Sequence, residues 1–410
     1  MELDVLIRGQ SNAFLLLTQG QDNVPGDPPG AALLQSEVQR LLGFDGVNDQ
    51  VHVNFDWWTP DAATIYSSTA FIGDWMQPGA NGWQPLDHEE ALLNHIRMNP
   101  HSDAASVAVL WFHSEFDSTN PDLTTELWTS AVRTDASLVR QAMGRDAASA
   151  PYLFVSAIPF LSASDSATQA IRTGMEELAA DPAFNAGIAA RALDLDMNFS
   201  FPSEPPTREW GRSHISPQDA ELIARRIARS LADEWAAYAK PGSPVAEAGG
   251  HIDAAGPQVI AANLVAPDTL RLTVLHDHSA GFAPLDADAA AGIGWSVRSG
   301  DTAVSADRVA ILSPDMLEVH FTEALPAGGR LFYGYGYGRL AQPDQPGAGN
   351  AVYDADGLPI WAPAQGVPIT DGPPITGAPG DDRLADRPGD TTIDGLSGYD
   401  WLDLQGSGYR

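Results

Sequence analysis

Cysteine is absent from this sequence of 410 residues. The chain can therefore form no disulfide bond, no thiolate metal site and no cysteine nucleophile. Positive charge is scarce as well, because 22 lysine and arginine residues stand against 54 aspartate and glutamate residues, and Lys240 is the only lysine. The formal net charge of −32 repels nucleic acid and anionic membranes, so we expect neither as a partner.

Long hydrophobic runs are also missing. No apolar segment is long enough to span a bilayer, and no basic stretch followed by an apolar stretch marks a signal peptide at Met1. We therefore expect a soluble protein without membrane insertion, and any export would use a signal other than an N-terminal one. The chain is too long for one ordinary core, which favours two or three domains.

Over residues 1–240, strand-like and helix-like segments alternate. This order is typical of a parallel sheet with helices on both faces, and five strands predict a flavodoxin-like α/β fold, a three-layer sandwich. The predicted strands are Leu3–Ile7, Val51–Phe55, Ser106–Phe112, Leu153–Ile158 and Ala192–Met197. The predicted helices are Ala31–Leu42, Leu86–Met98, Leu123–Met143, Ile171–Leu178 and Pro217–Ala239.

Helical periodicity disappears after a linker that begins at Pro241. Over residues 250–372, short alternating segments separated by Gly, Pro and Asp turns predict an all-β accessory domain, an antiparallel β-sandwich. Its clearest strands are Leu270–Leu275, Val309–Leu312, Leu317–Phe321 and Arg330–Tyr337.

Residues 373–410 contain a nine-residue repeat. The units that begin at Gly377 and Gly395 match the first and third glycines, the aspartate and the apolar position of the G-G-x-G-x-D-x-U-x pattern, whereas the unit between them has Thr391 in place of the aspartate. This RTX-type repeat is typical of a short parallel β-roll, in which Asp382 and Asp400 would face one Ca²⁺. A flexible tail rich in Gly and Asp is the alternative.

Ser11 follows the first predicted strand and the turn at Gly9, where a helix begins. A hydroxyl held at the carboxyl end of a sheet, next to the N–H groups of a helix N-terminus, suits a nucleophile that generates an oxyanion. The alternative is that Ser11 is only a helix N-cap.

Two other stretches carry polar groups to the same end of the predicted sheet. His214 lies in the loop that enters the last helix, so it could accept the proton of Ser11 as a general base, unless it is simply a solvated loop histidine. His113, Glu115 and Asp117 follow the third predicted strand. Polar clusters at carboxyl ends of strands are expected of a site, although they also form ordinary turns.

These segments together resemble the SGNH (GDSL-like) hydrolase superfamily, in its sialate O-acetylesterase and acetylxylan esterase branch. Gly9-Gln10-Ser11-Asn12 matches the G-Q-S-N nucleophile block of that branch. Asn81-Gly82-Trp83-Gln84-Pro85 looks like its F-G-P-E segment, Leu110–Asp117 is similar to its W-x-Q-G-E-S-D block, and His214-Ile215-Ser216 resembles its closing H-L-S or H-P-S block. The resemblance covers roughly the first 240 residues.

The resemblance implies an acyl-enzyme mechanism that needs no catalytic cofactor. His214 would deprotonate Ser11, and the oxyanion would be held by the N–H groups of Ser11 and Gly82 and by His113, which stands where the family has Gln. The alternative is that His113 is a structural histidine at the end of a strand. Trp57 and Trp58 could offer platforms to a sugar ring or could equally be packing residues.

The chain departs from the family at the third triad position. The family has Asp three residues before the histidine, and here that position is Gly211. Either Ser11 and His214 act as a dyad, or Glu209, Glu115 or Asp117 orients the imidazole. An orienting carboxylate can contribute several powers of ten in rate.

The resemblance implies a secreted carbohydrate O-acetylesterase, with an acetylated carbohydrate or a small ester as substrate. A general short-chain carboxylesterase and a non-catalytic glycan-binding or adhesive protein are the alternatives. Nonapeptide repeats accompany export by a C-terminal signal (type I) in Gram-negative bacteria, so we expect an extracellular protein with Ca²⁺ in its C-terminal repeats.

Overall fold

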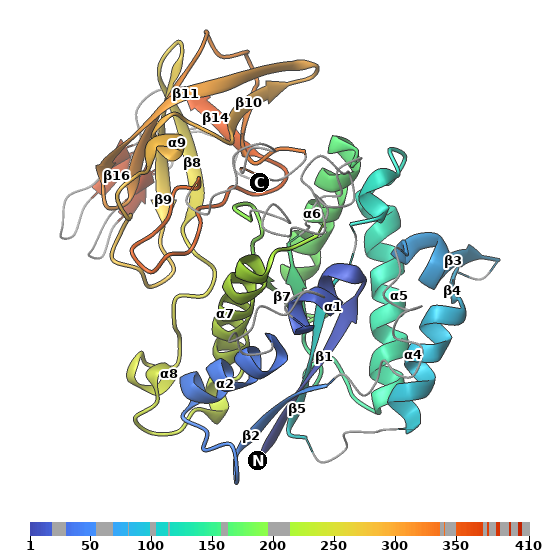
Figure 1. Cartoon of the computed structure of the whole chain (residues 1–410). Coiled ribbons are helices and arrows are strands. Elements are labelled where there is room, and N and C mark those ends of the chain that lie inside the picture. The colour runs from blue at the N-terminus through green and yellow to red at the C-terminus, as the bar shows by residue number, and fades with distance from the viewer. Residues whose placement is uncertain are drawn as a thin grey trace. The chain divides into compact units, whose positions relative to one another are not determined.

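A computed structural model describes residues 1–18, 30–54, 69–80, 82–98, 104–113, 115–156, 163–195, 214–336, 340 and 350–371, and four short strands beyond them. The chain forms two compact units (Figure 1). Unit 1 comprises Met1–Ala255 and Tyr335–Ala348, and unit 2 comprises Gly256–Gly334 and Gly349–Arg410. Unit 1 thus includes a segment, Tyr335–Ala348, that lies far from the rest of it in sequence.

Unit 1 is built on a parallel sheet of five strands in the order β2-β1-β5-β6-β7, which confirms the predicted α/β class. The strands are β1 (Glu2–Gly9), β2 (Gln50–Asn54), β5 (Ser106–Phe112), β6 (Tyr152–Val155) and β7 (Ala186–Ala190). Helices flank the sheet, with α2 and α7 on one side and α4 and α5 on the other (Figure 1). Two separate apolar cores lie between the sheet and these helix layers.

The five helices predicted for unit 1 are present as α2 (Gly30–Leu42), α4 (Asp87–Met98), α5 (Thr125–Met143), α6 (Asp165–Ala179) and α7 (Pro217–Glu234), although α6 begins six residues before its predicted start. Unit 1 also contains α1 (Ser11–Thr18), at the predicted strand-to-helix turn, and the short α8 (Pro244–Glu247), which lies in the segment predicted as a linker. The predicted helix that ended at Ala239 is α7 followed by a separate 3-10 turn, η5 (Ala236–Tyr238). None of the described helices is both long and apolar enough to cross a membrane.

The prediction of the fifth strand at Ala192–Met197 was wrong. The strand at this edge is Ala186–Ala190, because these residues pair with β6 from Tyr152 to Val155. The apolar side chains that suggested a strand, Leu193 and Leu195 among them, are buried in the segment that follows β7. Burial in a loop produced the same pattern as burial in a sheet.

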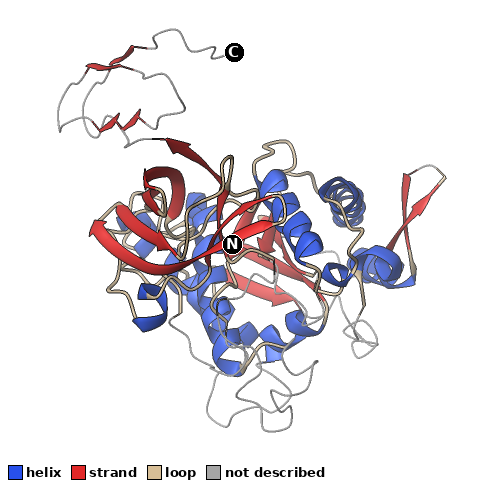
Figure 2. Cartoon of the chain, turned by 90° about the horizontal axis from the view of Figure 1, so that it is seen from above, coloured by secondary structure: helices blue, strands red, loops and turns tan. Residues whose placement is uncertain are grey.

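A short hairpin, β3 (Met76–Gly79) and β4 (Gly82–Pro85), follows an irregular single turn, η2 (Phe71–Trp75). The hairpin contacts α4, α5 and η2 rather than the central sheet. In Figures 1 and 2 it projects from the edge of unit 1.

Unit 2 is a closed barrel of seven strands, so the prediction of a β-sandwich was wrong. The strands are β8 (Gln258–Ala266), β9 (Thr269–Leu275), β10 (Trp295–Ser299), β11 (Thr302–Ser313), β12 (Met316–Phe321), β13 (Arg330–Tyr333) and β14 (Val367–Asp371), and a short helix, α9 (Ala287–Ala290), precedes β10. The barrel closes because β14 pairs with both β13 and β8. Barrels and sandwiches share the same alternation of inward and outward residues, so local patterns do not distinguish them.

Four short strands in the C-terminal tail pair in parallel. β15 (Ile375–Thr376) pairs with β17 (Ile393–Asp394), and β16 (Arg383–Ala385) pairs with β18 (Trp401–Asp403). Each pair joins segments two nine-residue units apart. Asp382 and Asp400 lie outside the described residues, so the β-roll and its calcium site stay predictions.

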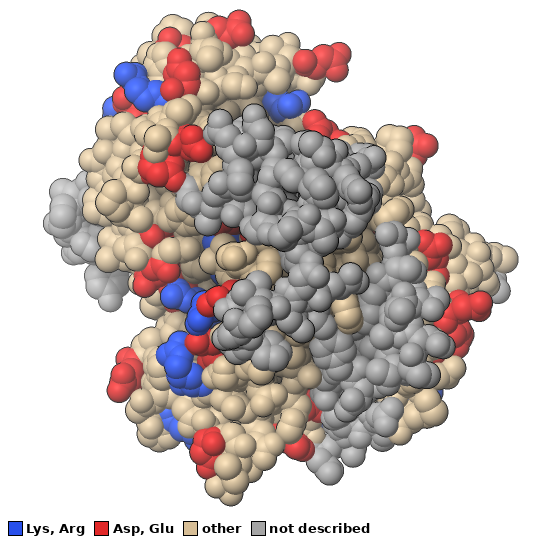
Figure 3. All heavy atoms as spheres, viewed as in Figure 1, with Lys and Arg blue, Asp and Glu red and all other residues tan. Residues whose placement is uncertain are grey.

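Acidic side chains dominate the charge of the visible surface. On the face drawn in Figure 3 they are scattered over the described residues, and basic side chains are fewer. This agrees with the formal net charge of −32.

Candidate active site

Ser11 and His214 meet at the carboxyl end of β1. The Nε2 atom of His214 lies 3.0 Å from the Oγ atom of Ser11, although the two residues are 203 positions apart in the chain. Both side chains are half-buried. A serine hydroxyl within hydrogen-bond distance of an imidazole nitrogen is the geometry of an activated nucleophile and its base.

Ser11 is the first residue of α1. The carbonyl of Gln10 accepts the hydrogen bond of the Phe14 N–H, so Gln10, and not Ser11, occupies the position before the helix. This arrangement does not favour the alternative that Ser11 is an N-cap. The N–H groups of the first helical turn have no partner within the helix, so the N–H of Ser11 remains available for a developing negative charge.

The turn before Ser11 requires glycine. A Cβ atom at Gly9 would lie 1.9 Å from the carbonyl oxygen of Phe112 on the neighbouring strand β5. β1 and β5 can therefore approach this closely only because Gly9 has no side chain. This close approach fixes where α1 begins.

His214 lies three residues before the first residue of α7, whose N-terminus is held by a capping box. The Ser216 side chain accepts from the Asp219 N–H, and the Asp219 carboxylate accepts from the Ser216 N–H. Pro217 occupies the first helical turn, where it lacks only an N–H that would have no helical partner. These local features determine where the loop of His214 joins the helix.

Asn12 connects the two candidate catalytic residues. Its Oδ1 atom accepts the backbone N–H of Ile215 at 3.0 Å, and its Nδ2 atom donates to Oε1 of Glu115 at 2.9 Å. The side chain of Asn12 is buried. The sequence showed Asn12 only as part of a motif and gave no indication of these partners, because both lie far from it in the chain.

Two of the three candidate orienting acids lie within the described residues. Glu115 contacts Asn12, and both oxygens of Asp117 accept backbone N–H groups, from Ile72 at 2.8 Å and from Phe71 at 2.9 Å. Burial raises the pKa of Asp117 to about 6. These contacts tie Asp117 to η2 rather than to the imidazole. Glu209, like Gly211, lies outside the described residues, so the identity of the third member stays open.

His113 is buried beside β5 and contacts a carbonyl. Its Nε2 atom lies 3.1 Å from the oxygen of Thr69, and because a carbonyl can only accept, Nε2 carries the proton. Burial, together with the positive charge of Arg8, lowers the pKa of His113 to about 3, so the ring is neutral. Its single N–H is already used, and this arrangement does not favour the predicted donation to an oxyanion.

Gly82 lies at the tip of the β3–β4 hairpin, paired with Gly79 and exposed. The hairpin packs on α4 and α5 and projects from the edge of the unit (Figure 2), and the role of Gly82 as an oxyanion donor stays a prediction. Gly73 lies in η2 directly after Phe71 and Ile72, whose amides bind Asp117, and its φ of 109° lies in the left-handed region that favours glycine.

A buried arginine lies three residues before Ser11. Arg8 forms ion pairs with Glu89 of α4 at 2.8 Å and with Asp135 of α5 at 2.7 Å, and all three side chains are fully buried. The Arg8 guanidinium also stacks near aromatic rings at 4.7 to 5.3 Å, those of Trp75, Trp111 and Phe71. Burial raises the pKa of Asp135 well above its ordinary value, and the positive charge of Arg8 opposes this shift. A single Arg within an apolar strand was the only sequence signal of this network.

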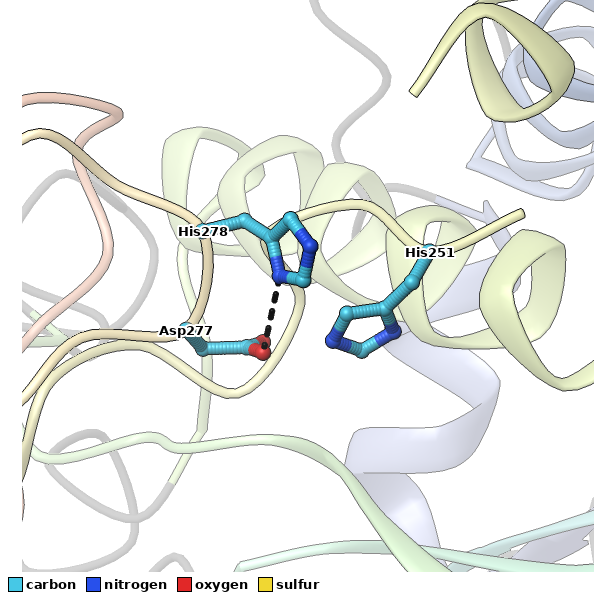
Figure 4. Close-up of side chains that lie close together, drawn as sticks. All are labelled: His251, Asp277 and His278. Carbon is cyan, nitrogen blue, oxygen red and sulfur yellow. Dashed lines mark ion pairs between the residues drawn. The ribbon is translucent and has the colours of Figure 1, made fainter. Parts of the chain in front are cut away.

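Other histidine–carboxylate contacts lie away from Ser11, and two of them involve His251 and His278. In unit 1, Nδ1 of His251 lies 2.6 Å from Oδ1 of Asp233. In unit 2, Nδ1 of His278 lies 3.8 Å from Oδ1 of Asp277 (Figure 4). All four side chains are partly or largely exposed, and we assign them no role in the chemistry at Ser11. Trp57 and Trp58 lie outside the described residues.

Comparisons with known proteins leave the site to be judged on its geometry. No protein-family model matches the sequence, and no curated protein sequence is similar to it. Among solved structures, the chain is similar to a carbohydrate acetylesterase from Xanthomonas citri, with 13% identity, a TM-score of 0.49, and coverage of 88% of this chain and 79% of that one. It also matches the bacterial S-layer protein SbsC over 39% of this chain and 22% of that one, with 14% identity and a TM-score of 0.22. Structural similarities this weak support no conclusion about the fold or the reaction of this protein.

Proposed function

We propose that this protein is a serine esterase that removes acyl groups, in the first place acetyl groups, from carbohydrate esters. The observation that carries the proposal is the contact of 3.0 Å between Oγ of Ser11 and Nε2 of His214 at the carboxyl edge of a parallel sheet. Active sites of open α/β sheets are built at this edge.

The mechanism follows from the atoms in contact. His214 accepts the proton of the Ser11 hydroxyl while the oxygen attacks the ester carbonyl, and the imidazolium then protonates the leaving alcohol. Water, deprotonated by the same imidazole, releases the acyl group and restores Ser11. Each step needs only a neutral imidazole at the start, and no metal or organic cofactor takes part.

The oxyanion would be held by backbone N–H groups. The first is the N–H of Ser11 in the opening turn of α1, which also adds the positive end of the helix dipole. We assign the second to Gly73 in place of Gly82 and His113, because η2 is held by Asp117 just beyond β5. Loss of a single oxyanion donor typically lowers kcat by about 10²- to 10³-fold.

The carbohydrate substrate is supported by the resemblance of the four sequence blocks to sialate O-acetylesterases and acetylxylan esterases. The same dyad would serve a short-chain carboxylesterase on esters that are not sugars. Secretion through a C-terminal signal and Ca²⁺ binding by Asp382 and Asp400 belong to the same proposal, and they rest on the repeat pattern alone.

The test is hydrolysis of 4-nitrophenyl acetate by the parent protein and by the variants Ser11→Ala and His214→Ala. We expect each variant to lose on the order of 10⁶-fold in kcat, as when the serine or histidine of a catalytic triad is removed. Ser36→Ala is the matched control, because Ser36 is an exposed serine on α2, and it should leave the rate unchanged. A parent protein without activity, or activity that survives Ser11→Ala, would overturn the proposal.

The substrate class is tested separately. We expect kcat/KM for acetylated xylan oligosaccharides or O-acetylated sialic acid to exceed that for aryl acetates and for longer acyl esters. The reverse order would indicate the short-chain carboxylesterase.

A further inference from the structure

We infer that Asn12 and Glu115 form a positioning pair that sets the distance between the nucleophile and its base without touching the substrate. The inference rests on the proposed function, and it concerns how His214 is held. Glu115 was a candidate for the acid that orients the imidazole. The geometry points instead to an indirect role, through Asn12 and the backbone of Ile215.

The first step is the orientation of the Asn12 amide. A backbone N–H can only donate, so the atom of Asn12 that lies 3.0 Å from the Ile215 nitrogen is the oxygen Oδ1. The carboxylate of Glu115 can only accept when ionised, so the atom 2.9 Å from Oε1 is the nitrogen Nδ2. Both ends of the amide are thus defined by their partners, and a flipped amide would break both bonds at once.

The second step is where these bonds attach. Asn12 directly follows Ser11, and Ile215 directly follows His214. A single buried side chain therefore links the backbone next to the nucleophile with the backbone next to the base, 203 residues away. Ile215 itself is fully buried in an apolar core that also contains residues of α1 and α7, so the backbone next to His214 is held in place.

The third step is the role of Glu115. It lies just beyond the end of β5, which pairs with β1 up to Gly9 and Phe112. The hydroxyl of Ser118 donates a hydrogen bond to the backbone carbonyl of Glu115, and this bond fixes the turn that carries Glu115. Glu115 therefore anchors the Asn12 amide to the sheet. In this arrangement its function is to accept a hydrogen bond, and its charge need not act on the imidazole.

Substitutions at the two positions separate positioning from direct electrostatic action. Asn12→Ala removes both bonds, and Glu115→Ala leaves the amide free to turn. We expect each to lower kcat for 4-nitrophenyl acetate by about 100-fold with little change in KM, the loss typical of a displacement of about 1 Å in a catalytic group. Glu115→Gln keeps an acceptor oxygen for Nδ2 of Asn12, so kcat should stay within about fivefold of the parent.

A reciprocal exchange provides the rescue. Asn12→Asp alone places two carboxylates in contact in a buried site and should be as damaging as Asn12→Ala. The double variant Asn12→Asp with Glu115→Gln restores an amide–carboxylate bond in the opposite direction, and an oxygen at position 12 still accepts the Ile215 N–H. We expect kcat of the double variant to recover at least tenfold over Asn12→Asp, an effect that general destabilisation would not produce.

The pH profile of kcat/KM gives the second readout. An acid that acts directly on His214 would raise the pKa of the imidazole, so Glu115→Gln would move the acidic limb of the profile to lower pH. If Asn12 and Glu115 only position the catalytic groups, the acidic limb of the profile in Glu115→Gln should lie at the same pH as in the parent protein. The melting temperature of each variant is measured to verify that the variant is folded under the assay conditions.

The outcomes distinguish this inference from the proposed function. If Ser11→Ala abolishes hydrolysis while Asn12→Ala and Glu115→Ala keep the parent kcat, the site is catalytic and the inference is wrong. A shifted acidic limb in Glu115→Gln, or a double variant no better than Asn12→Asp, also overturns the inference. Loss of kcat in the two alanine variants, together with recovery in the double variant, supports it.

Discussion

The neutral state of His113 makes the stability of unit 1 depend on pH. An unfolded histidine titrates near pH 6.5, whereas the folded protein lowers the pKa of His113 to about 3. Between these values the unfolded chain binds a proton that the folded chain does not. The contribution of His113 to stability is therefore fully present above pH 6.5 and is lost progressively as the pH falls from 6.5 toward 3.

The expected size follows from the linkage relation. Each pH unit within this window corresponds to about 1.4 kcal/mol, so acidification from pH 7.5 to pH 5 should lower the free energy of unfolding by about 2 kcal/mol through His113 alone. Burial is the larger cause of the lowered pKa, and the charge of Arg8 adds to it. Asp117 acts in the opposite direction, because its raised pKa of about 6 makes the folded state gain stability on acidification.

The variant His113→Gln isolates the histidine. Its amide keeps an N–H for the carbonyl of Thr69 but does not titrate, and the contribution of Asp117 is common to both proteins. We expect urea unfolding, followed by tryptophan fluorescence at about pH 5 to pH 8, to show a smaller loss of stability on acidification in the variant, by about 2 kcal/mol. Parallel curves for the two proteins would refute the reasoning, because they would show that folded His113 binds its proton near the ordinary pKa.

Three more predictions test the surroundings of Ser11. Arg8→Met leaves Glu89 and Asp135 buried without their cation, so the free energy of unfolding in urea should fall by about 3–5 kcal/mol. Gly9→Ala places a Cβ atom 1.9 Å from the carbonyl oxygen of Phe112, and it should lower the melting temperature and esterase activity together; unchanged values would exclude this close approach. Exchange of Gly73 for Ala keeps the backbone N–H but strains a φ of 109°, so it should displace this donor and lower kcat by about 10²-fold, whereas the same change at Gly82, which is also exposed and has the same φ of 109°, should leave the rate near that of the parent. Equal effects at the two glycines would contradict the assignment of Gly73.

The sequence predicted the elements of unit 1 because their signals are local. Alternation of apolar strands and amphipathic helices gave the sheet and most boundaries, and β5 was predicted at Ser106–Phe112, where the structure has it. The failures occurred where a local pattern has two causes. Leu193 and Leu195 are buried in a loop instead of a strand, and the alternating segments of unit 2 close into a barrel.

By itself, the sequence determined which chemistry is possible. It excluded cysteine chemistry and placed a serine, Ser11, at a strand-to-helix turn and a histidine, His214, before the last helix. Only the tertiary structure decided that Oγ and Nε2 lie 3.0 Å apart, that the N–H of His113 is taken by Thr69, and that Asn12 joins Glu115 to Ile215. These contacts depend on how the carboxyl ends of parallel strands align at one edge of the sheet. Residues so far apart in the chain produce no periodic pattern in the sequence that would predict their contact.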